Sequence, residues 1–400
     1  MSSGPATPTT KVDPNNPMSN YENSAQFSQL SQQIGPSQQP PMQQTYDRPS
    51  QFYSTHIGPT TELEPILLDL SPSTNSSMSG DTYQKSDNRT AFLVDQSGAE
   101  RSRGANLAAL GAVERLVGSY GPLLLQLYLT TTHRNFPVIE EGFFSDYENG
   151  RRSNLDPALL AAIYCLTVPW LSRDPRALSP LPDIYQLEDL AFRLFAESLY
   201  KPTLSTVQAG ILLLQKPNND SKTLNGQLVG AAYELGLHLD CSTWSSITAE
   251  KALRKRLGWA LYMQDKWCSL IHGRPSAIST NNWAVKALLD EDFGSFRIPS
   301  DTITVDEEIA RGRSLFREMV SLTEILSNVL DTFYTLRAMQ EVEDAGQGGT
   351  RLILERAKPV QIRLKNWFAG LPANLKMDNT MTGKPSSTGT EHCQQRLNSR

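Results

Sequence analysis

The chain has 400 residues, a formal net charge of −5 and a sequence pI near 5.7, so no general excess of basic residues is available to attract DNA or an anionic membrane. Hydrophobic residues make up only 39%, and Pro and Gly contribute 25 each. This dilute composition predicts a mixture of folded and disordered segments.

Residues 1–104 are dominated by Ser, Pro, Gln, Asn and Thr. They hold too few apolar residues to offset the entropy of an ordered chain, and disorder is expected. The first ten residues, MSSGPATPTT, lack the charged and apolar regions of a secretory signal. The sequence therefore favours a soluble, intracellular protein.

An acidic–hydrophobic island, TELEPILLDLSPS, interrupts this tail at 61–73. Its acidic residues keep neighbouring apolar side chains in water and available to a partner groove, as an activation or docking segment requires. The alternative is that the island packs on the chain's own folded domain. The side chains that would dock are Ile66, Leu67, Leu68 and Leu70.

From residue 105 apolar residues recur at helical spacing, and alternating strand patterns are absent. The fold class expected for residues 105–376 is all-α, a large multi-helix domain, with a disordered tail at 377–400. No fixed period indicates a solenoid. Helices are predicted over 105–120, 121–134, 157–171, 183–200, 205–215, 223–240, 249–273, 305–343 and 350–370.

The helix over 249–273 has a clear apolar ladder and ends in Gly273 and Pro275, which are typical helix-terminating residues. Its basic triplet spreads around the helix, and a solvated helix face is expected for Arg254, Lys255 and Arg256. The alternative for this triplet is a nuclear import patch.

Catalytic and metal-binding motifs are missing from the sequence, including the nucleophile elbow, the P-loop, GxGxxG and HExxH. Cys268 and His272 form a pair without further zinc ligands, so no metal or cofactor is predicted within this chain. The run LLDEDF at 288–293 could hold magnesium in an all-α enzyme such as a terpene synthase. No second acidic motif accompanies it, and a solvated loop is expected for Asp290, Glu291 and Asp292.

No stretch is predicted to cross a membrane, since the least polar one, 158–171, contains Pro169 and is shorter than the roughly 18–20 residues that a spanning helix needs. The four cysteines form no close pair, and reduced thiols are expected for Cys165, Cys241, Cys268 and Cys393.

Residues 203–285 contain four motifs in order: STVQAGILLL (205–214), LGLHLD (235–240), RKRLGWALYMQD (254–265) and GRPSAI (273–278). Their order and spacing resemble the fungal-specific transcription factor domain, also called the middle homology region or xylanolytic-activator-type regulatory domain. The segment LYLTTTHRNFPVIEEGFF (127–144) is similar to the opening of that domain. The resemblance covers about 120–295 and continues more weakly to about 375.

This resemblance implies a transcription regulator in a fungal nucleus that controls genes read by RNA polymerase II. The motifs LHLDCSTW, MQDKWCSLIHGRP and NNW are similar to activators of nitrogen-source catabolism. A charged pair is expected between Asp265 and Arg274, because a buried carboxylate needs a partner. The family-motif residues expected to hold the fold are His238, Asp240, Asp265, Gly273, Arg274 and Pro275.

Members of the family usually carry an N-terminal zinc cluster of six cysteines that places a helix in the DNA major groove. Residues 1–120 contain no cysteine, so no zinc ligand can be assigned here. The cluster is expected either upstream of this sequence or to have been lost, and zinc is expected only in the first case.

The partners implied are promoter DNA, reached through such a cluster or a partner factor, transcriptional co-regulators, and a second copy in a homodimer. One alternative is a promoter co-regulator that acts by protein contact without binding DNA directly. A more remote alternative is an all-α enzyme.

Overall fold

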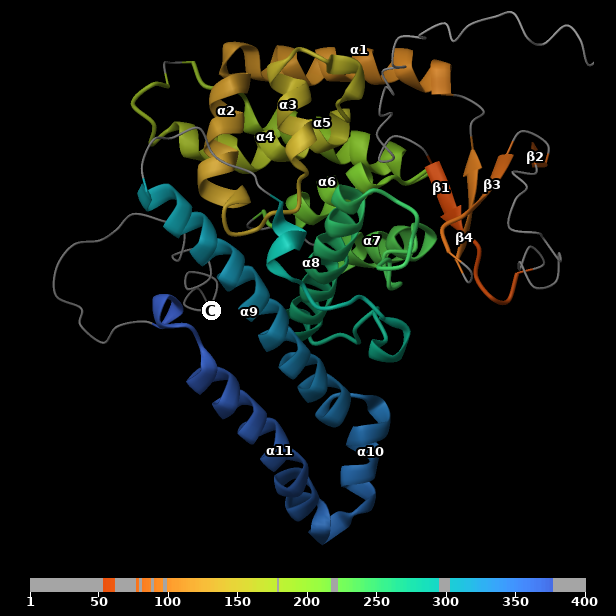
Figure 1. Ribbon diagram of the computed structural model, residues 1–400. Coiled ribbons are helices and arrows are strands. Elements are labelled where there is room, and N and C mark those ends of the chain that lie inside the picture. Colours follow the sequence, from red (N-terminus) through yellow and green to blue (C-terminus); the bar gives the residue numbers. More distant parts are fainter. Residues whose placement is uncertain are drawn as a thin grey trace, which may run out of the picture. The chain divides into compact units, whose positions relative to one another are not determined.

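Figure 1 shows the computed structural model, which describes residues 53–61, 77–78, 81–87, 90–95, 99–177, 180–216, 222–294 and 303–376. Most of these residues lie in α-helices, as the sequence predicts. Residues 62–76 and both terminal segments lie outside this part of the chain. The docking role therefore stays a prediction for Ile66, Leu67, Leu68 and Leu70.

Helix α4, Pro157–Leu171, is almost completely buried. Its residues are apolar on all sides, and such a helix is stable only where other elements surround it. Asp156 caps the first turn, because its carboxylate accepts a hydrogen bond of 2.9 Å from the Leu159 amide. The helices that pack on α4 include α1 (Ala99–Val117), α2 (Gly121–Tyr128), α5 (Ile184–Ser198) and α6 (Leu204–Leu214).

The core continues from α6 into α7 (Lys222–Glu234) and α8 (Thr248–His272). The helix predicted over 223–240 ends early, because Gly236 adopts a left-handed φ of 64° that turns the chain out of the helix. Helix α8 is followed by Gly273 in the same conformation, with a φ of 61°. Two glycines thus set the loops before and after α8, which carry the LGLHLD and GRPSAI motifs.

An extended segment connects the first helices to α4. The helix predicted over 121–134 is α2 followed by a π-helical turn, Leu129–His133. The chain then runs through Val138 to α3, Glu141–Glu148. Gln208 of α6 fastens this segment, since its amide nitrogen donates a hydrogen bond of 2.8 Å to the Val138 carbonyl.

Beyond α8 the chain forms α9 (Ile303–Phe333), α10 (Leu336–Asp344) and α11 (Gly349–Gly370). Helix α9 contacts α8, and α11 lies beside α9 and α10 (Figure 1). The single helix predicted over 305–343 is wrong at residues 334–335. A new helix begins there, because the Thr335 hydroxyl accepts a hydrogen bond of 3.1 Å from the Ala338 amide.

A four-stranded antiparallel sheet precedes α1, in the order β1-β4-β3-β2. The expectation of disorder over 1–104 is wrong for these strands and for α1, which begins at Ala99. Short strands need buried side chains for stability, and β4 buries Ala91 beside Ile57 and Phe92 beside Trp244. The strands are β1 (Tyr53–His56), β2 (Ser77–Met78), β3 (Asp81–Lys85) and β4 (Ala91–Asp95).

Candidate functional site

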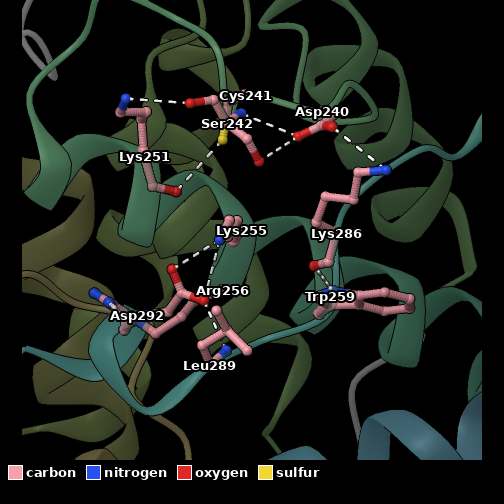
Figure 2. Close-up of polar contacts among 10 residues, drawn as sticks. All are labelled: Asp240, Cys241, Ser242, Lys251, Lys255, Arg256, Trp259, Lys286, Leu289 and Asp292. Atoms are coloured by element: carbon pink, nitrogen blue, oxygen red, sulfur yellow. Dashed lines mark hydrogen bonds and ion pairs between the residues drawn. The ribbon is translucent and has the colours of Figure 1, made fainter.

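The basic triplet of α8 lies inside the domain. Arg254 and Arg256 are only 8% and 6% exposed. The Lys255 ammonium lies 3.0 Å and 3.2 Å from the two carboxylate oxygens of Asp292 (Figure 2). A charge in such surroundings is stable only where a partner replaces water. The predicted solvated face is therefore wrong, and the buried side chains are not presented to an import receptor.

Arg256 joins α8 to two segments that are distant in the sequence. Its Nε donates a hydrogen bond of 2.7 Å to the Pro137 carbonyl, and its Nη1 donates to the Asp292 carbonyl. Burial lowers the pKa of Arg256 to about 10, while Glu140 and Asp292 oppose that shift. The guanidinium therefore stays charged at neutral pH, and its hydrogen bonds to both carbonyls are charge-assisted.

The predicted acidic loop contains one exposed and one buried aspartate. Asp290 is exposed and pairs with Arg317 at 2.9 Å, as a solvated loop would allow. Asp292 is buried, binds Lys255, and accepts a hydrogen bond of 2.8 Å from the Leu289 amide. The expected solvated loop is thus wrong for Asp292, whose carboxylate is an ion-pair partner within the fold.

Arg254 connects α8 to the sheet. Its Nε donates to Glu250 at 2.8 Å, and its Nη1 donates to the Leu235 carbonyl at 2.8 Å. The guanidinium carbon also lies 5.0 Å from the ring centroid of Trp244 and 5.7 Å from that of Phe92. Such cation–π contacts are stronger where water is excluded. Arg254 therefore holds β4 and the loop before α8 against one another.

The LGLHLD motif forms the loop between α7 and α8. The His238 carbonyl accepts a hydrogen bond of 2.7 Å from the Ala284 amide, and its ring lies edge-on to Tyr233 and His56 at 4.9 Å and 5.5 Å. Burial lowers the pKa of His238 to about 4, and the neighbouring His56 adds to the effect. This ring is therefore neutral at neutral pH and packs as part of the loop.

Asp240 stabilises its own turn and does not cap the next helix, which begins at Thr248. Its Oδ1 accepts from the Ser242 amide at 3.0 Å and from the Ser242 hydroxyl at 2.6 Å. Lys286 approaches Asp240 at 3.6 Å and is itself fixed through its carbonyl, which accepts from the Trp259 indole at 2.8 Å. Figure 2 shows both contacts, which link the motif loop to the segment after α8.

The start of α8 is fastened to the same loop. The Lys251 ammonium donates to the Trp244 carbonyl at 3.0 Å. The Cys241 thiol lies 3.6 Å from the Lys251 carbonyl (Figure 2). The pKa of the Cys241 thiol is raised by burial. This cysteine is thus a protonated, buried thiol, as expected for a reduced structural residue.

Asp265 holds the turn that follows α8. Its carboxylate is 1% exposed and accepts from the Ala277 and Ile278 amides at 3.0 Å and 3.1 Å. It also accepts from the Ser276 hydroxyl and, at 2.9 Å, from the Asn225 side chain of α7. The predicted pair with Arg274 does not form within residues 222–294. Arg274 is exposed, and the backbone amides of the GRPSAI turn compensate the carboxylate instead.

Two of the buried polar residues around Asp265 and its turn were not singled out from the sequence. Lys266 is buried, and its ammonium donates to Ser276 at 2.7 Å and to the Ile278 carbonyl at 2.6 Å. Its position directly after Asp265, in a mainly apolar part of α8, was a local signal for a buried network. Asn225 offered no such signal, because nothing in its own helix indicates a partner on α8.

A cavity of about 170 Å³ lies beside this turn, and Asn225, Asp265, Ser269 and Arg274 belong to its lining. Water takes roughly 30 Å³ per molecule in the liquid, so the space suits a few waters or a small solute. The Asp265 oxygens already accept hydrogen bonds from the protein. The cavity therefore presents no unengaged carboxylate to a ligand.

The described residues do not fit the zinc centre that the family resemblance implies. They contain no group of three or more His, Cys, Asp or Glu side chains that could hold a metal ion. Cys165, Cys241 and Cys268 are buried free thiols. Also within these ranges, no helix combines the length and apolar character needed to cross a membrane. The charged side chains around α8 instead bind one another and the backbone, which suits a scaffold.

The family model described as "Fungal specific transcription factor domain" matches residues 125–369. The match begins within α2 and ends within α11, and it includes all four motifs around α8. No solved structure matches the chain.

Fungal regulators are among the similar proteins. The transcriptional activator protein DAL81 of Saccharomyces cerevisiae is 33% identical over 315 residues, which is 70% of this chain and 32% of that protein. A transcriptional regulatory protein of Schizosaccharomyces pombe is 30% identical, over 55% of this chain and 33% of its own. The acetamidase regulatory protein of Aspergillus fumigatus is 28% identical, over 64% and 31%.

The chain thus matches about a third of the length of these relatives. The residues matched by the family model, 125–369, are more than half of this chain. The resemblance drawn from the motifs at 203–285 is confirmed. The chain belongs to the family of the fungal specific transcription factor domain, and it is a fungal transcription regulator domain.

Proposed function

We propose that this chain is the regulatory part of a nuclear transcription regulator and that it works through binding, without catalysis. The observation that carries the proposal is the compensation of the buried charges along α8. Arg256, Asp265 and Asp292 are each engaged by protein groups from other segments. Side chains committed in this way support a rigid framework and are poorly placed for proton transfer or metal binding.

Regulation by such a framework requires two states of the protein. In one state the surface that acts on transcription is masked, and in the other it is available. An effector or partner shifts the balance only if it binds the two states with unequal affinity. In this proposal the helical domain provides the surface for that partner, a transcriptional co-regulator or a second copy. The predicted docking segment, Ile66 to Leu70, is a further surface for the same purpose.

The process proposed is the use of nitrogen sources. The acetamidase regulatory protein similar to this chain is named for an enzyme class that releases ammonia from an amide. The motifs LHLDCSTW and MQDKWCSLIHGRP, together with NNW at 281–283, also resemble regulators of nitrogen-source catabolism. Promoter DNA is reached through a zinc cluster in the complete protein or through a partner factor, because the chain itself has a net charge of −5.

The test is a fusion of the 400-residue chain to an unrelated DNA-binding domain in a fungal reporter strain. We expect reporter output to differ from that of the DNA-binding domain alone, and to differ between ammonium and acetamide as nitrogen source. Arg256→Met should abolish the difference, whereas the exposed control Arg193→Met should preserve it. Equal output from the fusion and the DNA-binding domain alone, with both proteins present in equal amounts, would refute the proposed role.

A further inference from the structure

The cavity beside the turn after α8 has positive charge in its lining. Lys222 and Arg274 belong to that lining, and Asp265 is its acidic residue. The Asp265 carboxylate is already compensated by hydrogen bonds from the protein. The Arg274 side chain is exposed and forms no ion pair within residues 222–294. Two cations beside one engaged carboxylate favour a ligand that carries an anionic group.

Helix α7 begins at the same cavity. Its first turn supplies Lys222, Asn225 and Gly226 to the lining. Backbone amides at the start of a helix have no acceptor within the helix and carry partial positive charge. Gly226 has no side chain, and a methyl group at its position would meet no atom within 4 Å. The helix start therefore adds to the attraction for an anion and leaves space for one.

The turn that carries Arg274 is fixed to the end of α8. The Ser269 hydroxyl donates a hydrogen bond of 2.5 Å to the Arg274 carbonyl. The Arg274 amide donates to the Ser269 carbonyl at 3.2 Å. Because this backbone is already ordered, a ligand at the cavity does not have to overcome the entropy of ordering it.

The lining also contains a buried acceptor without a donor. Asn225 is only 5% exposed, and its side-chain nitrogen donates to Asp265 at 2.9 Å. Its Oδ1 accepts no hydrogen bond from the residues that the structure describes. A buried acceptor in this state is unfavourable, and an N–H group of a ligand would supply the missing donor. The lining thus matches a molecule with an anionic group and an N–H group on separate atoms.

A small amino acid has this combination. The cavity volume of about 170 Å³ equals that of roughly six molecules of liquid water, which suits alanine or serine. The Asp265 carboxylate attracts the ammonium group of an amino acid, whereas it repels a phosphate dianion. We propose that this cavity binds a small free amino acid. Its carboxylate lies towards Lys222 and Arg274, and its ammonium group donates to Asn225 Oδ1.

Such a ligand contacts α7 and the turn after α8 at the same time, so it stabilises their relative position. It shifts a regulatory balance only if this position differs between the masked and the available state. As an effector site, the cavity therefore rests on the proposed function. The binding itself does not depend on that role.

Isothermal titration calorimetry of the purified full-length chain tests the proposal, with L-alanine and L-serine as probes. We expect both to bind at a single site. Propionate is alanine without its amino group, and it should bind about tenfold or more weakly, because Asn225 Oδ1 then has no donor. Inorganic phosphate should be weaker by a similar factor, because Asp265 repels it. Equally tight binding of propionate or phosphate, or no binding of either amino acid, would overturn the proposal.

Two variants test whether the amino acid binds in this cavity. Arg274→Ala removes a cation from the lining and should weaken binding about tenfold or more. Gly226→Leu fills the open space beside the first turn of α7 and should have a similar effect. The matched control is Arg193→Ala, which removes an exposed arginine of α5 and should leave the affinity unchanged. Circular dichroism checks that every variant is folded. Binding that neither Arg274→Ala nor Gly226→Leu weakens would refute this site.

The reporter experiment separates the site from the regulatory role. Reporter output from the fusion, together with no binding of either amino acid, would refute the site alone. Binding in the calorimeter, together with no effect of the fusion on the reporter, would refute the regulatory role alone.

Discussion

Replacing Asp265 with asparagine tests whether this carboxylate holds the turn after α8. The two side chains have nearly the same shape, but the amide nitrogen of asparagine donates where the carboxylate oxygen accepts. Asp265 now accepts from two side chains and from two backbone amides of the turn. Each carboxylate oxygen accepts from one side chain and one backbone amide, so two of these donors face the amide nitrogen in the variant. Each unsatisfied buried donor costs about 1–3 kcal/mol, so the free energy of unfolding should fall by roughly 2–5 kcal/mol.

Thermal unfolding followed by far-ultraviolet circular dichroism measures this loss. For a domain of this size we expect Asp265→Asn to lower the Tm by roughly 5–15 °C. Arg274→Ala is the control, because the Arg274 side chain is exposed and Asp265 is engaged by other groups. Its effect should stay within about 0.5 kcal/mol. An unchanged Tm for Asp265→Asn, or an equal fall for Arg274→Ala, would show that the turn is held in another way.

Two further variants probe α8 and its loop. Arg256→Met leaves the Pro137 and Asp292 carbonyls without their donor, so urea titration should show about 2–4 kcal/mol less free energy of unfolding; an unchanged midpoint would contradict this. The pKa of His238 is about 4 in the folded protein and about 6.5 in the unfolded chain. The neutral ring's contribution to the free energy of unfolding is therefore complete above about pH 6.5 and is lost as the pH falls towards 4. The ring is partly exposed, which limits the effect to about 1–2 kcal/mol. The urea midpoint should therefore fall less between about pH 7 and pH 5 in His238→Gln than in the unaltered chain. An equal fall in both proteins would show that His238 does not cause the pH dependence.

Most helices could be predicted because their determinants are local. The structure places α8 at Thr248–His272 where the apolar ladder predicts 249–273, and Gly273 follows it as expected. The break before α10 was missed although Thr335 is a favourable capping residue, because the apolar spacing continues across it. The sheet was missed because its strands are short and lie in polar sequence, and their stability depends on contacts with the loop before α8.

The charged residues show where local reasoning fails. Arg256 looks like an ordinary surface residue of a helix, but its acceptors are the carbonyls of Pro137 and Asp292, which no periodicity in α8 reveals. A buried aspartate at position 265 correctly implied a partner, but the predicted partner, Arg274, was the wrong one. Backbone amides are present at every residue, so a sequence does not mark which of them will compensate a carboxylate.

The contact between the sheet and the loop before α8 also affects which fragments of the protein can be handled in isolation. Phe92 lies edge-on to Trp244 at 5.2 Å, and the Ser86 carbonyl accepts from the Ser245 amide at 2.9 Å. A fragment trimmed to the family match at 125–369 would lack Phe92 and the whole of α1. It would expose Trp244 and one side of α4 to water, which favours aggregation. We therefore expect the unit that unfolds cooperatively to be larger than residues 125–369, and recombinant fragments should begin before Tyr53.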